Sequence, residues 1–490
     1  MARSIIRQAG CGLAARPWGK AMHYYSTRGQ DGPLGYEDAL LSGLARDGGL
    51  YLPEAWPKFS YEDIAAMQGL SYAEFAGRIM APFCVGEVDE AELTAMARDA
   101  YADFDHPDIA PLFPLQDNLH VLELFHGPTI AFKDYAMQFL ALAFNRALQK
   151  KQQHAVIVGA TSGDTGSAAL EAFKGRDAVD VFILFPEGRV SPVQQRQMTS
   201  VIADGAHAVS VAGDFDDCQA IVKALFNDLE FRDQVNLSAI NSINWARLMP
   251  QVVYYFAAAL RLGAPAKKVA FSVPTGNFGN VFAGYVAVRM GLPVERLIIA
   301  SNQNDILPRF FASGLMARES VVPSLSPSMD IQVSSNFERL LFELLGRDGI
   351  STADVMKQFA ETGQFHVDNS VLARAKALFS AYRLDDDGTI AEIAATAKQN
   401  NMTIDPHSAV GVYAARQAHA DGTVSGDVPI VALACAHPAK FDAAVTKATG
   451  VAPKLPPHLS DLMKRPEQQQ HVAATVDAVK SLVLDMKRGS

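Results

Sequence analysis

Residues 154–173, HAVIVGATSGDTGSAALEAF, hold an apolar strand, a glycine-containing turn and a helix in direct succession. From this stretch onward, short runs rich in Val, Ile and Phe alternate with helical patterns, which is typical of parallel sheets with helices on their faces. Ser191 followed by Pro192 predicts a helix start, and that helix is expected to run through 194–202. Further candidate strands are 181–185, 208–211, 269–273, 297–300 and 430–434. The sequence therefore predicts an α/β fold with parallel-rich sheets.

The flanking sequence suggests a division into domains. Residues 22–105 are rich in helix formers, show no clear strand, and are expected to form a mainly helical N-terminal domain. Residues 106–450 would form two α/β lobes, and residues 451–490 a proline-rich turn followed by peripheral helices. Residues 1–21 carry four basic residues and no acid, as organelle transit peptides do, but Met22 offers a second plausible start. We expect residues 1–21 to be an extension without folded structure.

Composition narrows the class of protein. The chain has 490 residues, 49% of them hydrophobic, which is enough for a large core and more than one lobe. A net charge of -10 argues against a binder of nucleic acid or anionic membranes, so an anionic substrate would need a local basic pocket. No apolar run approaches the roughly 18 to 20 residues of a membrane-spanning helix. The four cysteines are far apart and form no CxxC pair, so we expect a cytoplasmic protein without a metal site.

Lys133 is the first candidate for chemistry. It follows Ile130, Ala131 and Phe132 within ELFHGPTIAFKDY, residues 123–135, in a stretch suited to burial. Burial destabilises a charged amine and lowers its pKa, which makes the amine a nucleophile for an aldehyde and a general base. The alternative is an ordinary lysine whose ammonium reaches solvent along a buried stem.

Two glycine turns, 160–166 and 274–280, each follow a strand and open a helix. Glycines at such a turn let backbone N–H groups face an anion, and the helix dipole adds to the attraction. The first turn suits a carboxylate and the second, PTGNFGN, a phosphate. Alternatively, Asp164 or Thr165 only caps a helix, and 274–280 is a plain tight turn. Neither matches the GxGxxG or GxxxxGK[ST] nucleotide motifs.

A third strand end, ACAHPAK at 434–440, is expected at the same edge of the sheet, where ligands bind in open parallel sheets. His437 could instead simply start the next helix. Cys435 could be a packed small hydrophobic residue.

Taken together, these segments resemble the threonine synthase family, in its longer branch with an added N-terminal domain. The resemblance rests on YSTRG (25–29), HGPTIAFKD (126–134), TSGDTG (161–166), NSINWARL (241–248), PTGNFGN (274–280), SSNFERLLF (334–342), DPHSAVG (405–411) and AHPAKF (436–441), in that order. It implies a two-lobed fold type II, like the tryptophan synthase β subunit, that binds pyridoxal 5'-phosphate (PLP).

The resemblance also assigns residues. Lys133 would hold PLP as an internal Schiff base. The cofactor phosphate would be bound by Gly276, Asn277, Phe278, Gly279 and Asn280. Cys435 would stand beside the pyridine nitrogen, where many relatives carry threonine; because a thiol is a weaker hydrogen-bond partner, slightly altered cofactor tuning is expected. Residues expected to contact the substrate carboxylate are Thr161, Ser162, Gly163, Asp164 and Thr165. Residues expected at the substrate phosphate are Asn241, Ser242, Asn244, Arg247, Ser334, Ser335, Asn336 and Arg339.

The implied reaction converts O-phospho-L-homoserine and water to L-threonine and phosphate, in a monomer or a homodimer. Arg247 and Arg339 could alternatively pair with surface acids. One competing hypothesis is a PLP lyase acting on threonine, serine or another phosphorylated amino alcohol, and another is a family member that has lost catalysis. A nicotinamide-binding protein is the least supported. All of these PLP hypotheses require Lys133 to lie beside the turn at 276–280.

Overall fold

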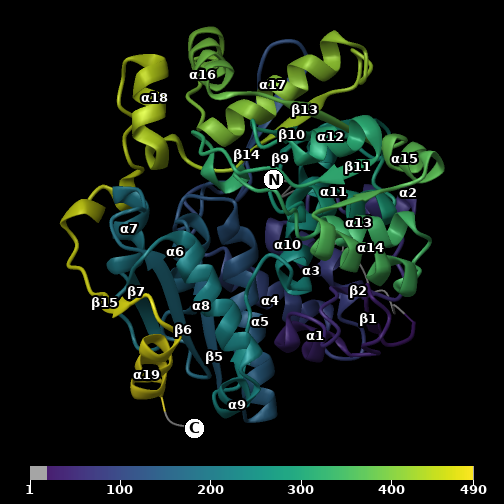
Figure 1. Ribbon diagram of the computed structural model, residues 1–490. Coiled ribbons are helices and arrows are strands. Elements are labelled where there is room, and N and C mark those ends of the chain that lie inside the picture. Colours follow the sequence, from purple (N-terminus) through teal and green to yellow (C-terminus); the bar gives the residue numbers. More distant parts are fainter. Residues whose placement is uncertain (1–18, 489–490) are drawn as a thin grey trace, which may run out of the picture.

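The computed structural model describes residues 19–488, so the expected extension at 1–21 falls almost wholly outside the described residues. Two parallel-rich sheets form the two lobes (Figure 1). The larger sheet has the order β13-β10-β9-β14-β4-β3, in which β3 alone is antiparallel to its neighbour. Its strands are β3 (Leu112–Pro114), β4 (Leu119–Glu123), β9 (Val269–Pro274), β10 (Val294–Ser301), β13 (Phe379–Arg383) and β14 (Ile430–Ala434).

The smaller sheet has the order β15-β7-β6-β5-β8 and is parallel throughout. Its strands are β5 (Ala155–Ala160), β6 (Val179–Pro186), β7 (Ala206–Ala212), β8 (Leu237–Ser238) and β15 (Gln470–Ala473). All six strands expected from the sequence are confirmed in the two sheets. The short strands β3, β4, β8, β13 and β15 were not expected.

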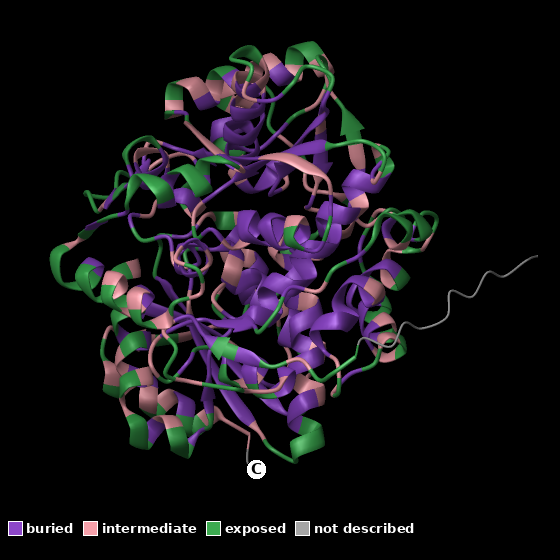
Figure 2. Cartoon of the chain, turned by 90° about the vertical axis from the view of Figure 1, so that its right-hand side faces the viewer, coloured by how far each residue is buried: buried purple, intermediate pink, exposed green. Residues whose placement is uncertain are grey.

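Helices cover both sheets, and the central strands lie buried between them (Figure 2). The helix α17 packs on β9, β10 and β14, whereas α6 packs on β6 and α8 on β5. The helices of the lobes are α5 (Lys133–Lys151), α6 (Asp164–Phe173), α7 (Pro192–Thr199), α8 (Phe215–Asn227), α9 (Leu229–Gln234), α10 (Trp245–Arg261), α11 (Gly279–Arg289), α12 (Ile306–Ser313), α13 (Phe337–Leu344), α14 (Gly349–Thr362), α15 (Asn369–Lys376), α16 (Asp386–Asn400), α17 (Pro406–Ala420) and α18 (Asp442–Thr449). Within residues 19–488, none of these helices is long and apolar enough to cross a membrane.

The predicted start of α7 is confirmed, because the Ser191 hydroxyl accepts from the backbone N–H of Gln194, 3.3 Å away. The helix ends at Thr199, earlier than expected. A two-stranded sheet of β11 (Leu315–Ala317) and β12 (Gln364–His366) lies beside α12 and α14.

The N-terminal segment contains α1 (Tyr36–Ser42), α2 (Tyr61–Ala66), α3 (Tyr72–Met80) and α4 (Glu90–Ala100). The segment is mainly helical, but it also contains an antiparallel pair of strands that was not predicted, β1 (Tyr24–Ser26) and β2 (Tyr51–Pro53). Each strand has three residues, too few for an alternating pattern to be recognised in sequence. These helices share one hydrophobic core with α5 and α10, so the segment is packed firmly on the lobes.

The C-terminal segment also differs from the expectation of peripheral helices. After two short 3₁₀ helices, Pro457–Leu459 and Leu462–Lys464, β15 adds to the edge of the smaller sheet beside β7. Only then does α19 (Val476–Met486) follow, and it packs against α8. The last residues therefore complete a sheet.

Candidate active site

The site is built at the carboxyl ends of three neighbouring strands, β4, β14 and β9. The chain after β4 meets the chain after β14, because the N–H of Phe132 donates to the carbonyl of Cys435 (2.8 Å) and that of His437 to Ile130 (3.0 Å). The ring of Tyr135 lies 5.8 Å from that of Tyr254, centroid to centroid. Tyr254 in turn donates to the side-chain oxygen of Asn280 (2.7 Å), in the turn after β9. These contacts bring the start of α5 beside the turn at 276–280.

Lys133 is the first residue of α5, and only 11% of its side chain is exposed. Burial lowers the pKa of its amine; Asp164 opposes this effect, and the positive charges of Lys440 and Arg247 add to it. The alternative of an ammonium that reaches solvent is therefore wrong. The side chain is a buried amine that can lose its proton more easily than an ordinary lysine.

Asp164 links Lys133 to a second buried lysine, Lys440. The Asp164 carboxylate lies 3.3 Å from the amine of Lys133 and 2.7 Å from that of Lys440. The amide of Gln194 also donates to it (2.7 Å). Although burial raises the pKa of Asp164, Lys440 and Lys133 outweigh burial and hold it well below its usual range. Asp164 is therefore an ionised carboxylate whose oxygens are already occupied.

Lys440 was not singled out from the sequence. Its side chain is fully buried and donates to the carbonyl of Thr129 (2.9 Å) as well as to Asp164. The only sequence feature that could have indicated a role for Lys440 is its place in AHPAKF, two residues after Pro438. By sequence alone, a lysine in that place looks like an ordinary surface lysine.

The turn after β5 is held by Thr161, whose hydroxyl accepts from the N–H groups of Gly163 and Gly166, both at 2.9 Å. Gly163 occupies the N-cap of α6 without a side-chain bond, so neither Asp164 nor Thr165 caps this helix. Ser162 is exposed. If a substrate carboxylate docks here, backbone N–H groups and Ser162 can meet it, whereas the Asp164 carboxylate would repel it.

The turn after β9 is braced from behind. The Ser334 hydroxyl donates to the Gly276 carbonyl (2.7 Å), and the backbone and side-chain N–H groups of Asn336 both donate to the Asn277 carbonyl (3.0 and 2.9 Å). Phe278 takes the left-handed conformation, with φ of 65°, to open α11. These contacts hold the carbonyls of Gly276 and Asn277 toward Ser334 and Asn336, so that the carbonyls are not available to the N–H groups of the turn.

The same turn offers donors that have no partner. Within residues 19–488, the backbone N–H groups from Gly276 to Asn280 find no hydrogen-bond acceptor, and neither does the buried side-chain nitrogen of Asn280. The Asn280 oxygen is oriented by Tyr254 and Tyr255 (2.7 and 2.9 Å), which aims the nitrogen the other way. Converging N–H donors at a helix start form a nest for an anion. Together with the buried amine of Lys133, at the start of the helix that Tyr135 and Tyr254 connect to this turn, the donor set fits a molecule that carries a phosphate and an aldehyde.

The two arginines behave differently. Arg339 is fully buried and holds the carbonyls of Tyr51 (3.0 Å) and Ile243 (2.6 Å), as well as the side chain of Asn336. Arg247 donates to the Ile240 carbonyl (2.9 Å), and its buried Nε has no partner in the described chain. Burial lowers the pKa of Arg247 to about 10 and that of Arg339 to about 9. Neither pairs with a surface acid, so that alternative is wrong, and Arg247 keeps more free donors.

The other residues predicted at the substrate phosphate are spread around these arginines. Asn244 is the N-cap of α10 and donates to the Leu40 carbonyl (2.9 Å), so it ties the N-terminal segment to the lobes. Ser242 lies 3.5 Å from the Asn336 amide. Asn241 is exposed and Ser335 is half-buried.

Cys435 and His437 follow the carboxyl end of β14. The thiol of Cys435 is buried, which raises its pKa, and its closest acceptor is the Leu433 carbonyl at 3.8 Å. The Cys435 N–H donates to the hydroxyl of Ser408 (3.0 Å). His437 accepts from the Ala439 N–H (3.2 Å) and so starts the 3₁₀ helix Pro438–Phe441, as the structural alternative expected. Burial lowers its pKa to about 4.

Three family models match the chain in succession. They are "Threonine synthase N terminus" over residues 23–101, "Pyridoxal-phosphate dependent enzyme" over 110–367 and "Threonine synthase, C-terminal" over 408–483. In the described residues, no group of three His, Cys, Asp or Glu side chains is arranged to hold a metal ion.

Individual proteins match over nearly the whole length. The chain is 51% identical to the threonine synthase of Pseudomonas aeruginosa, covering 91% of this chain and 95% of that one. It is 41% identical to that of Saccharomyces cerevisiae, covering 87% and 88%. A crystal structure of PLP-bound threonine synthase from Brucella melitensis superposes with a TM-score of 0.93 at 53% identity, covering 96% of this chain and all of that one.

Proposed function

Because the chain belongs to the threonine synthase family of PLP-dependent enzymes, we propose that it converts O-phospho-L-homoserine and water to L-threonine and phosphate. The observation that supports this proposal at the level of residues is a buried amine with a lowered pKa at the start of α5, which Tyr135 and Tyr254 connect to a turn whose N–H donors have no acceptor in the described chain. The other residues take their roles from these two features.

Lys133 would hold the aldehyde carbon of PLP, and the N–H groups of Gly276 to Asn280 would bind its phosphate. When bound, PLP supplies a place for the negative charge left on the substrate's α-carbon after a proton is removed. The nitrogen of Asn280 completes the phosphate site, since its oxygen is fixed by two tyrosine hydroxyls. Cys435 would face the pyridine nitrogen with a weak hydrogen-bonding group.

Lys133 is also the proton carrier in this proposal. Its amine has a lowered pKa, so near neutral pH a larger share of it is neutral and can accept the proton of the α-carbon. The same nitrogen can next take a proton from the β-carbon, which lets phosphate leave the γ-carbon. It can then return a proton to the γ-carbon and, after water adds at the β-carbon, another to the α-carbon. Asp164, held by Lys440 and Gln194, would keep the amine oriented.

The substrate's two anionic groups would be bound by different segments. The turn at 161–165 would meet the carboxylate through backbone N–H groups and the hydroxyl of Ser162. Arg247, whose Nε is buried without a partner, is the better candidate for the phosphate. Arg339 would support that site from behind through Asn336.

The test is an absorption spectrum of the purified protein followed by a phosphate-release assay with O-phospho-L-homoserine. We expect PLP absorbance, and phosphate and threonine released in equal amounts. A PLP lyase would release ammonia and a keto acid from threonine or serine, and a diverged family member would bind PLP without turnover. Either result would refute the proposed reaction.

We also propose a cytoplasmic location. Three cysteines in the described part of the chain, Cys84, Cys218 and Cys435, support this, because they are buried and free, as in proteins of reducing compartments.

A further inference from the structure

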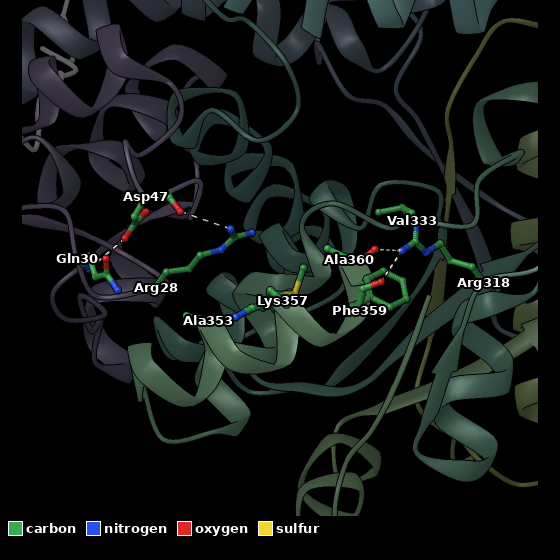
Figure 3. Close-up of a pocket in the computed structure, with 10 residues that line it drawn as sticks. Arg28, Gln30, Asp47, Arg318, Val333, Ala353, Lys357, Phe359 and Ala360 are labelled. Carbon is green, nitrogen blue, oxygen red and sulfur yellow. Dashed lines mark hydrogen bonds between the residues drawn. The ribbon is translucent and has the colours of Figure 1, made fainter. Parts of the chain in front are cut away.

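A cavity of about 560 Å³ lies between the N-terminal segment and α14, and it shares no residue with the Lys133 site (Figure 3). Its volume is in the range of small-molecule sites, about 300 to 1,000 Å³. It is lined by Arg28, Gln30, Asp47, Arg318, Val333, Ala353, Met356, Lys357, Phe359 and Ala360.

On the N-terminal side of the cavity, the one cation is paired with a carboxylate, and a second carboxylate is present. The guanidinium of Arg28 is bound by both carboxylate oxygens of Glu338, at 3.0 and 3.1 Å. Asp47 is already held by the hydroxyl of Ser26 (2.7 Å) and the N–H of Gln30 (3.0 Å). This side therefore offers an anion no free cation, and Asp47 would keep an anionic ligand toward the opposite side.

The opposite side holds two cations without acidic partners. Arg318 donates to the carbonyls of Phe359 and Ala360, and its guanidinium lies 4.8 Å from the centre of the Phe359 ring. Lys357 extends from α14 and makes no hydrogen bond or ion pair with another described residue. Figure 3 shows Arg28 and Arg318 extending toward one another across the cavity. The guanidinium of Arg318 is thus held in place while part of its donor fork stays free.

The side of the cavity that holds Arg318 and Lys357 indicates the chemical class of its ligand. In a protein of net charge -10, two unpaired cations at one cavity create a local attraction for anions. A guanidinium binds a carboxylate or a phosphate through paired N–H donors. The lining also includes the apolar side chains of Val333, Ala353 and Met356, which suit a short carbon chain. We propose that this cavity binds a small organic dianion, a dicarboxylate or a phosphate ester, anchored by Arg318 and Lys357.

The position of the cavity makes its occupant an effector. Val333 is 46% exposed and precedes Ser334, whose hydroxyl donates to the carbonyl of Gly276. An occupant therefore rests against the segment that braces the turn at 276–280. Ordering this segment would change how firmly the turn is held.

The test is calorimetric titration of the PLP-loaded enzyme with succinate and, separately, with inorganic phosphate. We expect saturable binding of succinate in the millimolar range, weakened about threefold in Lys357→Gln and about tenfold in Lys357→Glu. Lys398→Gln is the matched control, since it removes the same charge from the exposed face of α16 and should bind as the wild type does. Arg318→Gln should abolish binding, but Lys357 is the sharper probe because it holds no part of the fold.

Several outcomes would overturn the assignment. Succinate affinity that is unchanged in Lys357→Glu would place binding elsewhere, as would equal losses in Lys357→Gln and Lys398→Gln. Inorganic phosphate could also bind at the catalytic site, and substitution of Lys357 would not change that affinity. Only phosphate binding that weakens in the Lys357 variants is therefore assigned to the cavity. Succinate should also change KM or kcat in the wild type and not in Lys357→Glu; bound succinate with unchanged kinetics would refute the effector role. Because the titration measures succinate binding directly, its result does not depend on which reaction the enzyme catalyses.

Discussion

Replacing Lys440 with methionine should destabilise the protein in a pH-dependent way. Methionine keeps the length and packing of the side chain but removes the cation that lies 2.7 Å from the Asp164 carboxylate. Breaking a buried ion pair costs about 3–5 kcal/mol, because the remaining charge is left uncompensated. Lys133, at 3.3 Å, and Gln194, at 2.7 Å, still contact the carboxylate, so we expect the lower end, about 3 kcal/mol.

The pH dependence follows from the pKa of Asp164. In the wild type this pKa is held well below the usual range, so the stability it contributes is complete above about pH 4 and is lost as pH falls through the lowered pKa. Without Lys440 the pKa of Asp164 rises from its wild-type position, because burial is then opposed by fewer stabilising contacts. The carboxyl group can then take up a proton in the folded state, and the deficit of the variant should shrink between neutral pH and about pH 4.

The assay is urea unfolding followed by circular dichroism at several pH values. The protein should be freed of cofactor, because the Lys133 side chain is then the free amine to which these distances refer. Asp164→Asn added to Lys440→Met should recover about 1–2 kcal/mol, since the uncompensated charge is gone. A deficit that is the same at every pH, or a double variant whose loss equals the sum of the single losses, would refute the reasoning.

Three further predictions concern the site. Lys133→Ala should lower kcat by at least about 10⁴-fold and abolish the PLP–lysine absorbance, because proton transfer and the covalent anchor are lost together; stopped assays and spectra measure both. Gly276→Ala should weaken PLP binding, measured by fluorescence titration, because an added methyl group would lie 2.4 Å from the Ser328 carbonyl oxygen. His437→Asn should make the free energy of unfolding less sensitive to acid. Because the pKa of His437 is lowered from 6.5 to about 4 in the folded protein, the wild type loses about 3 kcal/mol of stability as pH falls from 6.5 to 4, which urea unfolding measures.

Each of these predictions has a control. Wild-type turnover in Lys133→Ala would remove that residue from the mechanism. Gly426→Ala is matched to Gly276→Ala, since nothing lies within 4 Å of its added methyl group, and equal PLP affinity in both would refute the steric argument. Asparagine can still cap the helix at position 437, so a variant as acid-sensitive as the wild type would show that another group titrates.

The sequence predicted best those features that are local. Each of the six expected strands is a short apolar run that can be recognised by itself, and each glycine turn follows such a run directly. The amine at 133 was predicted from the three apolar residues before it. In these cases the residues that decide the structure are neighbours in the chain.

Features that depend on distant partners were missed. Lys440 is buried because Thr129 and Asp164, far away in the chain, surround it with acceptors. Arg339 was expected at a substrate phosphate, yet its donors hold the carbonyls of Tyr51 and Ile243, and no local pattern reveals a main-chain carbonyl as a partner. Strand β15 is a half-exposed, polar edge strand, so its composition does not distinguish it from a loop.

The place of β15 has a consequence for how the protein is made. On the ribosome, the outer edge of β7 remains unpaired until Gln470–Ala473 emerges, well after the other strands of the sheet have been synthesised. An open strand edge pairs readily with other chains. A nascent polypeptide that lacks β15 is thus open to self-association. Arg488, which follows α19 and is bound to Asp180 near the start of β6, secures the closure later still.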